Sequence, residues 1–276
     1  MSAPPGTPFV APPGPPFAAP PGTSFFARPG ATLTEIAVLL IGLGLLAQAG
    51  LSLSHAGRQG LAEQRTALAA RRLEAALATA ALATATLPCP DARDAPDGRA
   101  DSTWCQRVGL VPWRTLGIAR ADALDGWGAL FSYRPAPELV APAHGGTAWV
   151  PGAGPLACDR AGATLRQIVS SLMIAPGPAP LPHAQAAYAL ISHGPNRKGA
   201  VLADGQPFAL GVATATRAEA LNAGVVPAGG AAQVWHGPDP SDAPAPDGTL
   251  FDDRVFWVPP LVLLEEAGCR PDGPGF

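Results

Sequence analysis

Apolar residues gather in one long run near the start of the chain, over residues 36–53, where only Gln48 and Ser52 are polar. A stretch that is apolar on every side is typical of a helix surrounded by lipid or by other apolar helices. Together with residues 31–34, this run approaches the about 20 residues that a helix needs to cross a bilayer. We therefore predict a membrane-spanning segment at about 33–53.

The same run lies in the longest part of the chain that is free of proline. The chain contains 34 prolines, yet none falls between Pro29 and Pro88. Proline removes a helical hydrogen bond and clashes with the preceding turn, so its absence permits one uninterrupted helix and Pro88 should end it. We predict this helix over residues 31–87.

After the membrane segment the pattern becomes amphipathic. Leucines recur at spacings close to the helical repeat, and arginine, glutamine and glutamate occupy positions between them. This pattern predicts a helix with one buried stripe, so the second half of the helix should pack on a folded domain. The leucines are Leu61, Leu68, Leu73, Leu77 and Leu82.

The rest of the chain, residues 88–276, consists of short apolar segments separated by glycine, proline and aspartate. Such segments predict strands joined by turns. We expect an α+β fold in which the long N-terminal helix packs on a head domain with a mostly antiparallel sheet. The predicted strands are 130–133, 148–150, 187–192, 208–213, 233–236 and 254–258, and a short helix is predicted over 165–173.

Residues 1–30 form a segment of a different kind. A Pro-Pro-Gly motif that leads to a phenylalanine recurs with a period of eight, at Phe9, Phe17 and Phe25. The fixed φ and the missing N–H group of proline favour extended, polyproline-like chain over packed structure. We interpret this segment as a leader or linker.

Composition and charge narrow the range of partners. The chain is 47% hydrophobic and 14% charged, which is apolar enough for a packed core. Its net charge of -3 provides no basic face for phosphate groups, so no nucleic acid is expected as a partner. We predict neither a cofactor nor a metal site.

The four cysteines, Cys89, Cys105, Cys158 and Cys269, contain no C-x-x-C pair, which argues against a zinc or redox motif. Disulfides are the simpler use, and they imply an oxidising compartment for an exported head. Pairing Cys89 with Cys105 would close a short loop and leave Cys158 with Cys269, although the sequence permits three connectivities.

The residues at the start of the apolar run, 30–35, read Gly-Ala-Thr-Leu-Thr-Glu. A carboxylate at the edge of a membrane segment is costly unless it is paired, which makes Glu35 a functional candidate. The block resembles the N-terminus of type IV pilins and type II secretion pseudopilins. In that family a glycine precedes the cleaved bond, and the mature chain opens with a small block ending in glutamate.

The resemblance implies a role for three residues. Gly30 would be recognised by the prepilin peptidase, which cuts the bond to Ala31, and Ala31 would become the new, methylated N-terminus. Glu35 would pair with the charged terminal amine of a neighbouring subunit. Because each charge is tolerable in an apolar environment only with the other, the pair would set the axial register between subunits.

Segments of the head resemble a poorly characterised group of prepilin-type proteins. They read as turns and strands, including Gly109-Leu110-Val111-Pro112-Trp113 and the Ser-His-Gly-Pro-Asn turn that begins at Ser192. The segments are 87–91, 104–105, 109–117, 125–128, 133–134, 189–196 and 251–258.

The resemblance implies a structural subunit, a minor pilin or pseudopilin of a type IV pilus or a type II secretion-like filament, that acts by assembly and not by catalysis. Removing the first 30 of 276 residues would leave 246, which is large for a repeating major subunit. Its partners would be the prepilin peptidase, other pilin or pseudopilin subunits, the inner-membrane assembly platform and membrane lipid. One helix would hold it in the bacterial inner membrane with a periplasmic head, before it enters a filament.

Other classes of function are weaker. A single-span, membrane-anchored exported domain that binds a ligand or partner is the alternative. An enzyme site at Ser192 and His193 is disfavoured because neighbouring strand residues point to opposite faces, and the chain has no G-x-S-x-G elbow. Asp252 and Asp253 supply two carboxylates, too few for the six to eight oxygens of a calcium site, so we predict solvated loop acids there.

Overall fold

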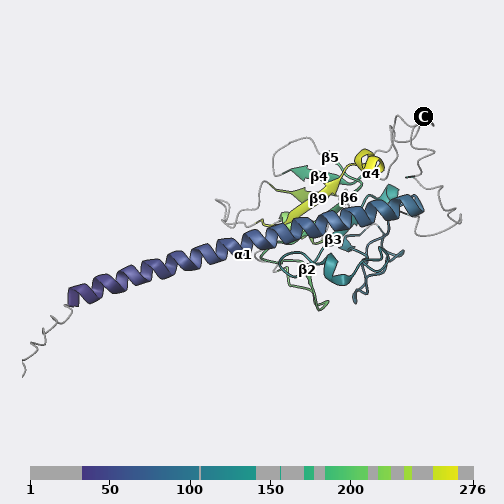
Figure 1. The fold of residues 1–276 in the computed structure, drawn as a ribbon. Coiled ribbons are helices and arrows are strands. Elements are labelled where there is room, and N and C mark those ends of the chain that lie inside the picture. Colours follow the sequence, from purple (N-terminus) through teal and green to yellow (C-terminus); the bar gives the residue numbers. More distant parts are fainter. Residues whose placement is uncertain are drawn as a thin grey trace, which may run out of the picture. The chain divides into compact units, whose positions relative to one another are not determined.

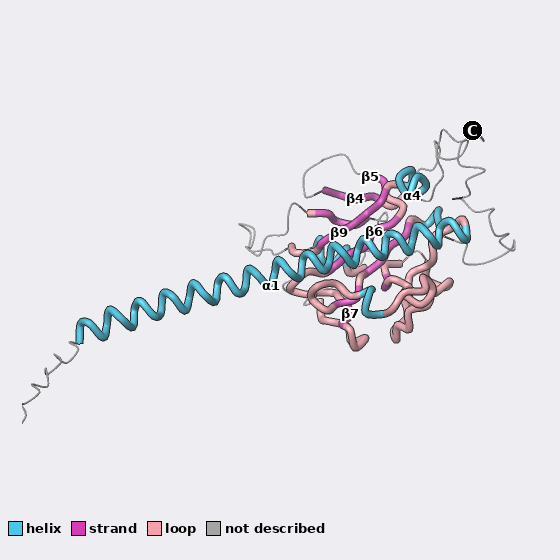
Figure 2. The backbone as a smooth tube through the Cα atoms, in the orientation of Figure 1, coloured by secondary structure: helices cyan, strands magenta, loops and turns pink. Residues whose placement is uncertain are grey.

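The structure is a computed structural model that describes residues 33–140 except Gln106, then Leu156, 171–176, 184–210, 217–224, 233–237 and 251–266. The chain divides into two compact units, Met1–Leu53 and Ser54–Phe276. Figures 1 and 2 show the helices and strands.

The helices are α1 (Leu33–Thr84), α3 (Arg217–Asn222) and α4 (Pro260–Glu266), with 3-10 turns at Arg120–Ala123 and Pro137–Leu139. The strands are β1 (Gly109–Leu110), β2 (Ala129–Leu130), β3 (Ser132–Pro135), β4 (Met173–Pro176), β5 (Ala184–Gln185), β6 (Tyr188–Ser192), β7 (Val201–Leu202), β8 (Gln233–His236) and β9 (Arg254–Val258).

The long N-terminal helix is confirmed, and it ends earlier than predicted. It runs from Leu33 to Thr84 without a break, whereas the prediction extended to residue 87. Ala85 has a φ of 56°, in the left-handed region that does not continue a right-handed helix. The helix therefore ends before the proline at position 88 can act on it.

The buried stripe of α1 differs from the predicted row of leucines. Leu73 and Leu77 are buried, but Leu61, Leu68 and Leu82 are about half exposed. Small residues before and after the two buried leucines form most of the stripe: Thr66, Ala69, Ala70, Ala78 and Ala81. Small side chains let the helix approach the rest of the second unit closely, and the large leucines then fall on its outer face.

The principal sheet of the second unit has the strand order β1-β3-β6-β9, with every pair antiparallel. Its central register aligns Ser132 with Ile191 and Ile191 with Val255. A second sheet, β5-β4-β8, contains a parallel pair between β4 and β8, and β2 pairs with β7. The prediction of a mostly antiparallel α+β head is confirmed, with β4–β8 as the exception.

Several local predictions need correction. Three predicted strands, 187–192, 233–236 and 254–258, correspond to β6, β8 and β9. The predicted strand 130–133 is divided at Phe131 between two different sheets, and residues 208–210 are not a strand. Met173 begins β4 and does not end a helix, because it pairs with Gln185 and Gln233. The predicted strand 148–150, residues 211–213 and most of the predicted helix 165–173 lie outside the described residues.

Candidate functional site

In the described part of the first unit, the candidate site is the apolar first half of α1. Residues 33–53 would extend about 31 Å as a helix, close to the thickness of the hydrocarbon core of a bilayer. The large apolar side chains from Leu33 to Leu51 are all at least 45% exposed, and none of the most apolar stretch is buried. By length and composition this helix can cross a membrane. The core helix of a water-soluble protein would instead be mostly buried.

The structure places one of the three predicted processing and assembly residues. Glu35 lies in the first turn of α1 and is exposed. A carboxylate in that position interacts favourably with the free N–H groups and the positive end of the helix dipole. Gly30 and Ala31 lie outside the described residues.

Two of the four cysteines form a disulfide in the head. Cys89 and Cys105 are bonded and both are buried, so the bridge closes the loop that precedes β1. This confirms the expected use of cysteine in a disulfide for this pair. Cys158 and Cys269 lie outside the described residues.

The second candidate site is a buried polar cluster centred on His193, at the end of β6. The His193 side chain is fully buried, and its Nε2 lies 2.9 Å from Ser132 Oγ on β3. On the other side of the ring, Nδ1 lies 3.6 Å from Asp253 Oδ1, immediately before β9. Ser132 and Asp253 are both at least 95% buried. Three strands of one sheet thus bring a hydroxyl, an imidazole and a carboxylate into a row.

Ser192, the neighbour of His193, belongs to a different part of the cluster. Its Oγ donates a 2.7 Å hydrogen bond to Asp125 Oδ2. The other carboxylate oxygen of Asp125 accepts hydrogen bonds from the N–H groups of Trp127 and Ala129, which closes the Asp-Gly-Trp-Gly turn. Burial raises the pKa of Asp125, and the hydrogen bond from Ser192 acts against that rise. As predicted from strand geometry, Ser192 and His193 do not hydrogen-bond to each other through their side chains.

Asp252 and Asp253 are not solvated loop acids, so that prediction was wrong. Both are at least 96% buried. Asp252 Oδ2 accepts a 2.9 Å hydrogen bond from the N–H of Asn196. A Cβ on Gly194, whose φ is +60°, would overlap the backbone of Asp252, so this turn needs glycine. Burial is the main cause that raises the pKa of Asp252 to about 6, and the neighbouring charges of Asp253 and Glu219 add to it.

Helix α3 completes the cluster from the other side. Glu219 Oε1 accepts a 2.8 Å hydrogen bond from Asn196 Nδ2. Asn222 donates from Nδ2 to Asp253 Oδ2 at 2.8 Å, and its amide group also pairs with the backbone of Trp235 on β8. The cluster therefore connects both larger sheets and α3 through side chains that are far apart in sequence.

Three buried atoms of the cluster have no hydrogen-bond partner among the described residues: His193 Nδ1, Asp252 Oδ1 and Asp253 Oδ1. Such atoms are rare in folded proteins and call for a structural or functional reason. Among the described residues, no group of three or more His, Cys, Asp or Glu side chains is arranged to hold a metal ion.

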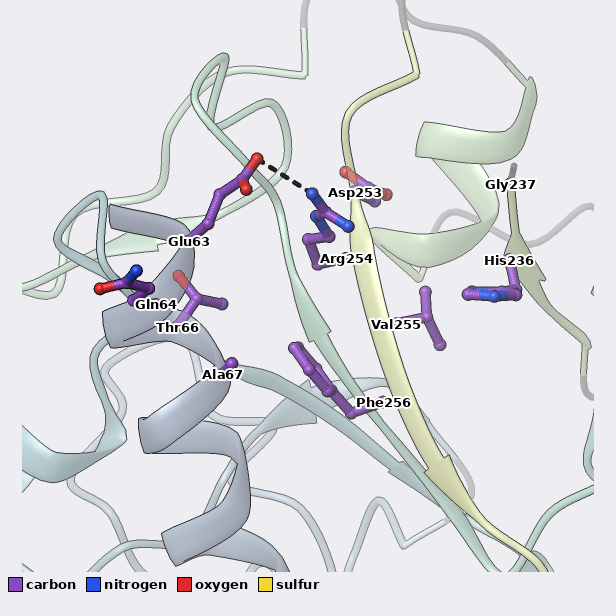
Figure 3. A pocket seen from close by; sticks show the side chains of 10 residues that line it. All are labelled: Glu63, Gln64, Thr66, Ala67, His236, Gly237, Asp253, Arg254, Val255 and Phe256. Atoms are coloured by element: carbon purple, nitrogen blue, oxygen red, sulfur yellow. Dashed lines mark hydrogen bonds and ion pairs between the residues drawn. The ribbon is translucent and has the colours of Figure 1, made fainter. Parts of the chain in front are cut away.

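Two clefts lie beside this cluster in the second unit. The helix cleft, about 700 Å³, is bounded by Glu63, Thr66 and Ala67 of α1, by residues of β8 and β9, and by Asp253 immediately before β9. Figure 3 shows Glu63 and Arg254 joined across it by an ion pair of 2.9 Å. The loop cleft, about 450 Å³, has Ser132 among its lining residues. The two ends of the His193 row thus reach different clefts.

Sequence reasoning singled out Ser192, His193, Asp252 and Asp253 but missed Ser132. No motif marks Ser132, because its contact with His193 depends on the register between β3 and β6.

Comparison with protein-family models, with curated proteins and with solved structures finds no match for this chain. Its function therefore has to be argued from the helix and the head themselves.

Proposed function

We propose that this protein is a structural subunit, a minor pilin or pseudopilin, of a type IV pilus or a type II secretion-like filament. One observation carries the proposal: residues 33–53 of α1 form an apolar helix whose large side chains are exposed from Leu33 to Leu51, and it begins with a single carboxylate, Glu35. Such a helix needs an apolar environment, and a subunit of this kind uses two in turn. Lipid surrounds it before assembly, and the helices of other subunits surround it afterwards.

The position of Glu35 supports an assembly role over simple anchoring. A carboxylate at the edge of a lipid anchor costs free energy if it is drawn into hydrocarbon without a partner. Paired with the terminal amine of an adjacent subunit, it would be neutralised in the filament core and would fix the axial register. The amine would be that of Ala31, exposed when the prepilin peptidase cuts after Gly30.

The disulfide supports export of the head. Disulfides form and persist in oxidising compartments such as the periplasm, and Cys89 is bonded to Cys105 in the second unit. We therefore place the protein in the bacterial inner membrane by its single helix, with the head in the periplasm. The inner-membrane assembly platform and other pilin or pseudopilin subunits are its proposed partners.

The first experiment tests processing. The protein is expressed in cells with an active prepilin peptidase, extracted from the membrane and analysed by mass spectrometry. We expect an N-terminal peptide that begins at methylated Ala31, and we expect Gly30→Leu to block the cut while Gly22→Leu, a change within the same leader, does not. An intact Met1 alongside a correctly processed second substrate would instead support a membrane-anchored ligand-binding domain.

The second experiment tests assembly with Glu35→Gln, which keeps the size of the side chain and removes its charge. Breaking a buried charge pair costs about 3–5 kcal/mol, so incorporation into sheared filaments should fall at least about tenfold while membrane insertion and processing persist. Asp204→Asn, on an exposed loop of the head, serves as the matched control. Equal incorporation of the Glu35 variant and the control would refute the register role.

A further inference from the structure

The row formed by Ser132, His193 and Asp253 has the order of a serine nucleophile centre. If the Ser132 hydroxyl donates to His193 Nε2 across their 2.9 Å contact, the imidazole carries its proton on Nδ1. That Nδ1 faces Asp253 Oδ1 at 3.6 Å. A base within hydrogen-bond reach of a hydroxyl, with a carboxylate behind it, is the geometry that activates serine. The looser second contact is common in ligand-free sites and shortens when the ring becomes charged.

The unpaired atoms in the row suggest more than a structural role. His193 Nδ1 and Asp253 Oδ1 are buried and lack hydrogen-bond partners among the described residues. A purely structural contact would leave one buried donor and one buried acceptor without hydrogen bonds, and each such group costs about 1–3 kcal/mol of stability. The cost is recovered when His193 accepts a proton, because the imidazolium and the Asp253 carboxylate then attract each other directly.

Ser132 is buried but borders a cleft on one side. It lines the loop cleft, whose volume of about 450 Å³ falls within the range of small-molecule sites. Val108, Leu110, Val201 and Pro207 give the cleft an apolar lining. Arg93 stands at the same cleft, held by Asp91 at 3.1 Å and Asp97 at 2.7 Å. The lining suits a short aliphatic acyl group beside a polar end.

We propose that Ser132, His193 and Asp253 form a centre in the head that hydrolyses carboxylic esters with short acyl groups. This activity goes beyond the proposed filament role and does not depend on it. Ser132 is the nucleophile and His193 the general base, so both are catalytic residues. Asp253 acts through His193 and is a positioning residue, itself held by Asn222 at 2.8 Å.

The reaction needs only the ester and water. Ser132 Oγ bonds to the carbonyl carbon while its proton passes to His193 Nε2. The bond from that carbon to the alkoxy oxygen then breaks, and His193 returns the proton to the departing alcohol. Water attacks the acyl-serine, giving one proton to His193. Release of the carboxylic acid returns that proton to Ser132.

The experiment uses the full chain in mild detergent, treated with a fluorophosphonate probe and with p-nitrophenyl acetate. We expect the probe on the peptide that contains Ser132, located by mass spectrometry. Ser132→Ala and His193→Ala should lower ester hydrolysis at least about 100-fold, as for loss of a nucleophile or a general base. Ser192→Ala, a buried neighbour that pairs with Asp125 instead, should retain labelling and activity.

Asp253 requires its own readout. Asp253→Asn keeps an acceptor for Asn222 Nδ2, so the fold should persist, and we expect kcat to fall while KM is unchanged. The labelling of Ser132 in the unmodified chain tests the proposal even if a variant fails to fold, because this readout needs no substitution. Absence of the probe from Ser132 in the folded chain, while a known serine hydrolase in the same tube is labelled, would overturn the proposal. Equal hydrolysis by Ser132→Ala would do the same.

Discussion

The buried carboxylate of Asp252 predicts an unusual dependence of stability on pH. Its pKa is raised to about 6 in the folded head, against 3.8 for an unperturbed aspartate. The folded state therefore holds this proton at pH values where the unfolded chain has lost it. As the pH rises from about 4 to above 6, the group should remove stability from the fold.

The size of the effect follows from the two pKa values. The folded and unfolded pKa values differ by about two units. This difference lowers the free energy of unfolding by about 3 kcal/mol at a pH where Asp252 is ionised in both the folded and the unfolded state. For a domain of this size, that free energy corresponds to about 6–12 °C in melting temperature. Asp252→Asn removes the charge, keeps an oxygen to accept from the N–H of Asn196 and places an amide group at the unpaired Oδ1.

The assay is thermal unfolding of the full chain in mild detergent, followed by near-ultraviolet circular dichroism between pH 4 and pH 8. We expect the variant and the unmodified protein to melt together near pH 4, and the variant to melt higher above pH 6. Asp204→Asn, the same change at an exposed aspartate, is the matched control. If the difference between Asp252→Asn and the unmodified protein stays constant across this range, the charge of Asp252 is not what governs the profile.

Two further predictions concern how the head is held together. A Cβ on Gly126 would overlap the backbone carbonyl of Ala62 on α1, so Gly126→Ala should destabilise the head by at least about 2 kcal/mol. A Cβ on Gly60 would meet open space, so Gly60→Ala should raise the melting temperature slightly. Thermal unfolding of both variants, followed by circular dichroism, tests this, and an unchanged melting temperature for Gly126→Ala would show that the helix can move aside. Replacing Cys89 and Cys105 together by alanine should lower the free energy of unfolding by about 2–4 kcal/mol, because the loop that the disulfide closes, with a sequence separation of 16, becomes free in the unfolded chain. The melting temperatures of this variant and the unmodified protein test the prediction, and equal values would mean that the bridge does not stabilise the fold.

The close packing of α1 on the head shows that sequence patterns alone do not predict which residues of a helix are buried. Leucine periodicity correctly indicated one helix and its buried residues Leu73 and Leu77, but not that alanines would form most of the contact. Gly126 donates its N–H to Thr66 Oγ1 at 2.9 Å, a contact between residues 60 apart. Which face of a helix is buried depends on the surface it meets, and that surface is not part of the helix sequence.

Local physical chemistry determined the elements whose causes are local. The proline-free stretch specified α1, and apolar strand patterns specified β8 and β9 with their observed bounds. The exposed apolar half of α1 and the position of Glu35 also follow from neighbouring residues alone. Only the tertiary structure placed Ser132 against His193, which is 61 residues away in sequence. It also buried Asp252 against Asn196, which is 56 residues away. Those contacts arise from strand register and sheet order, which are set by the packing of the whole head.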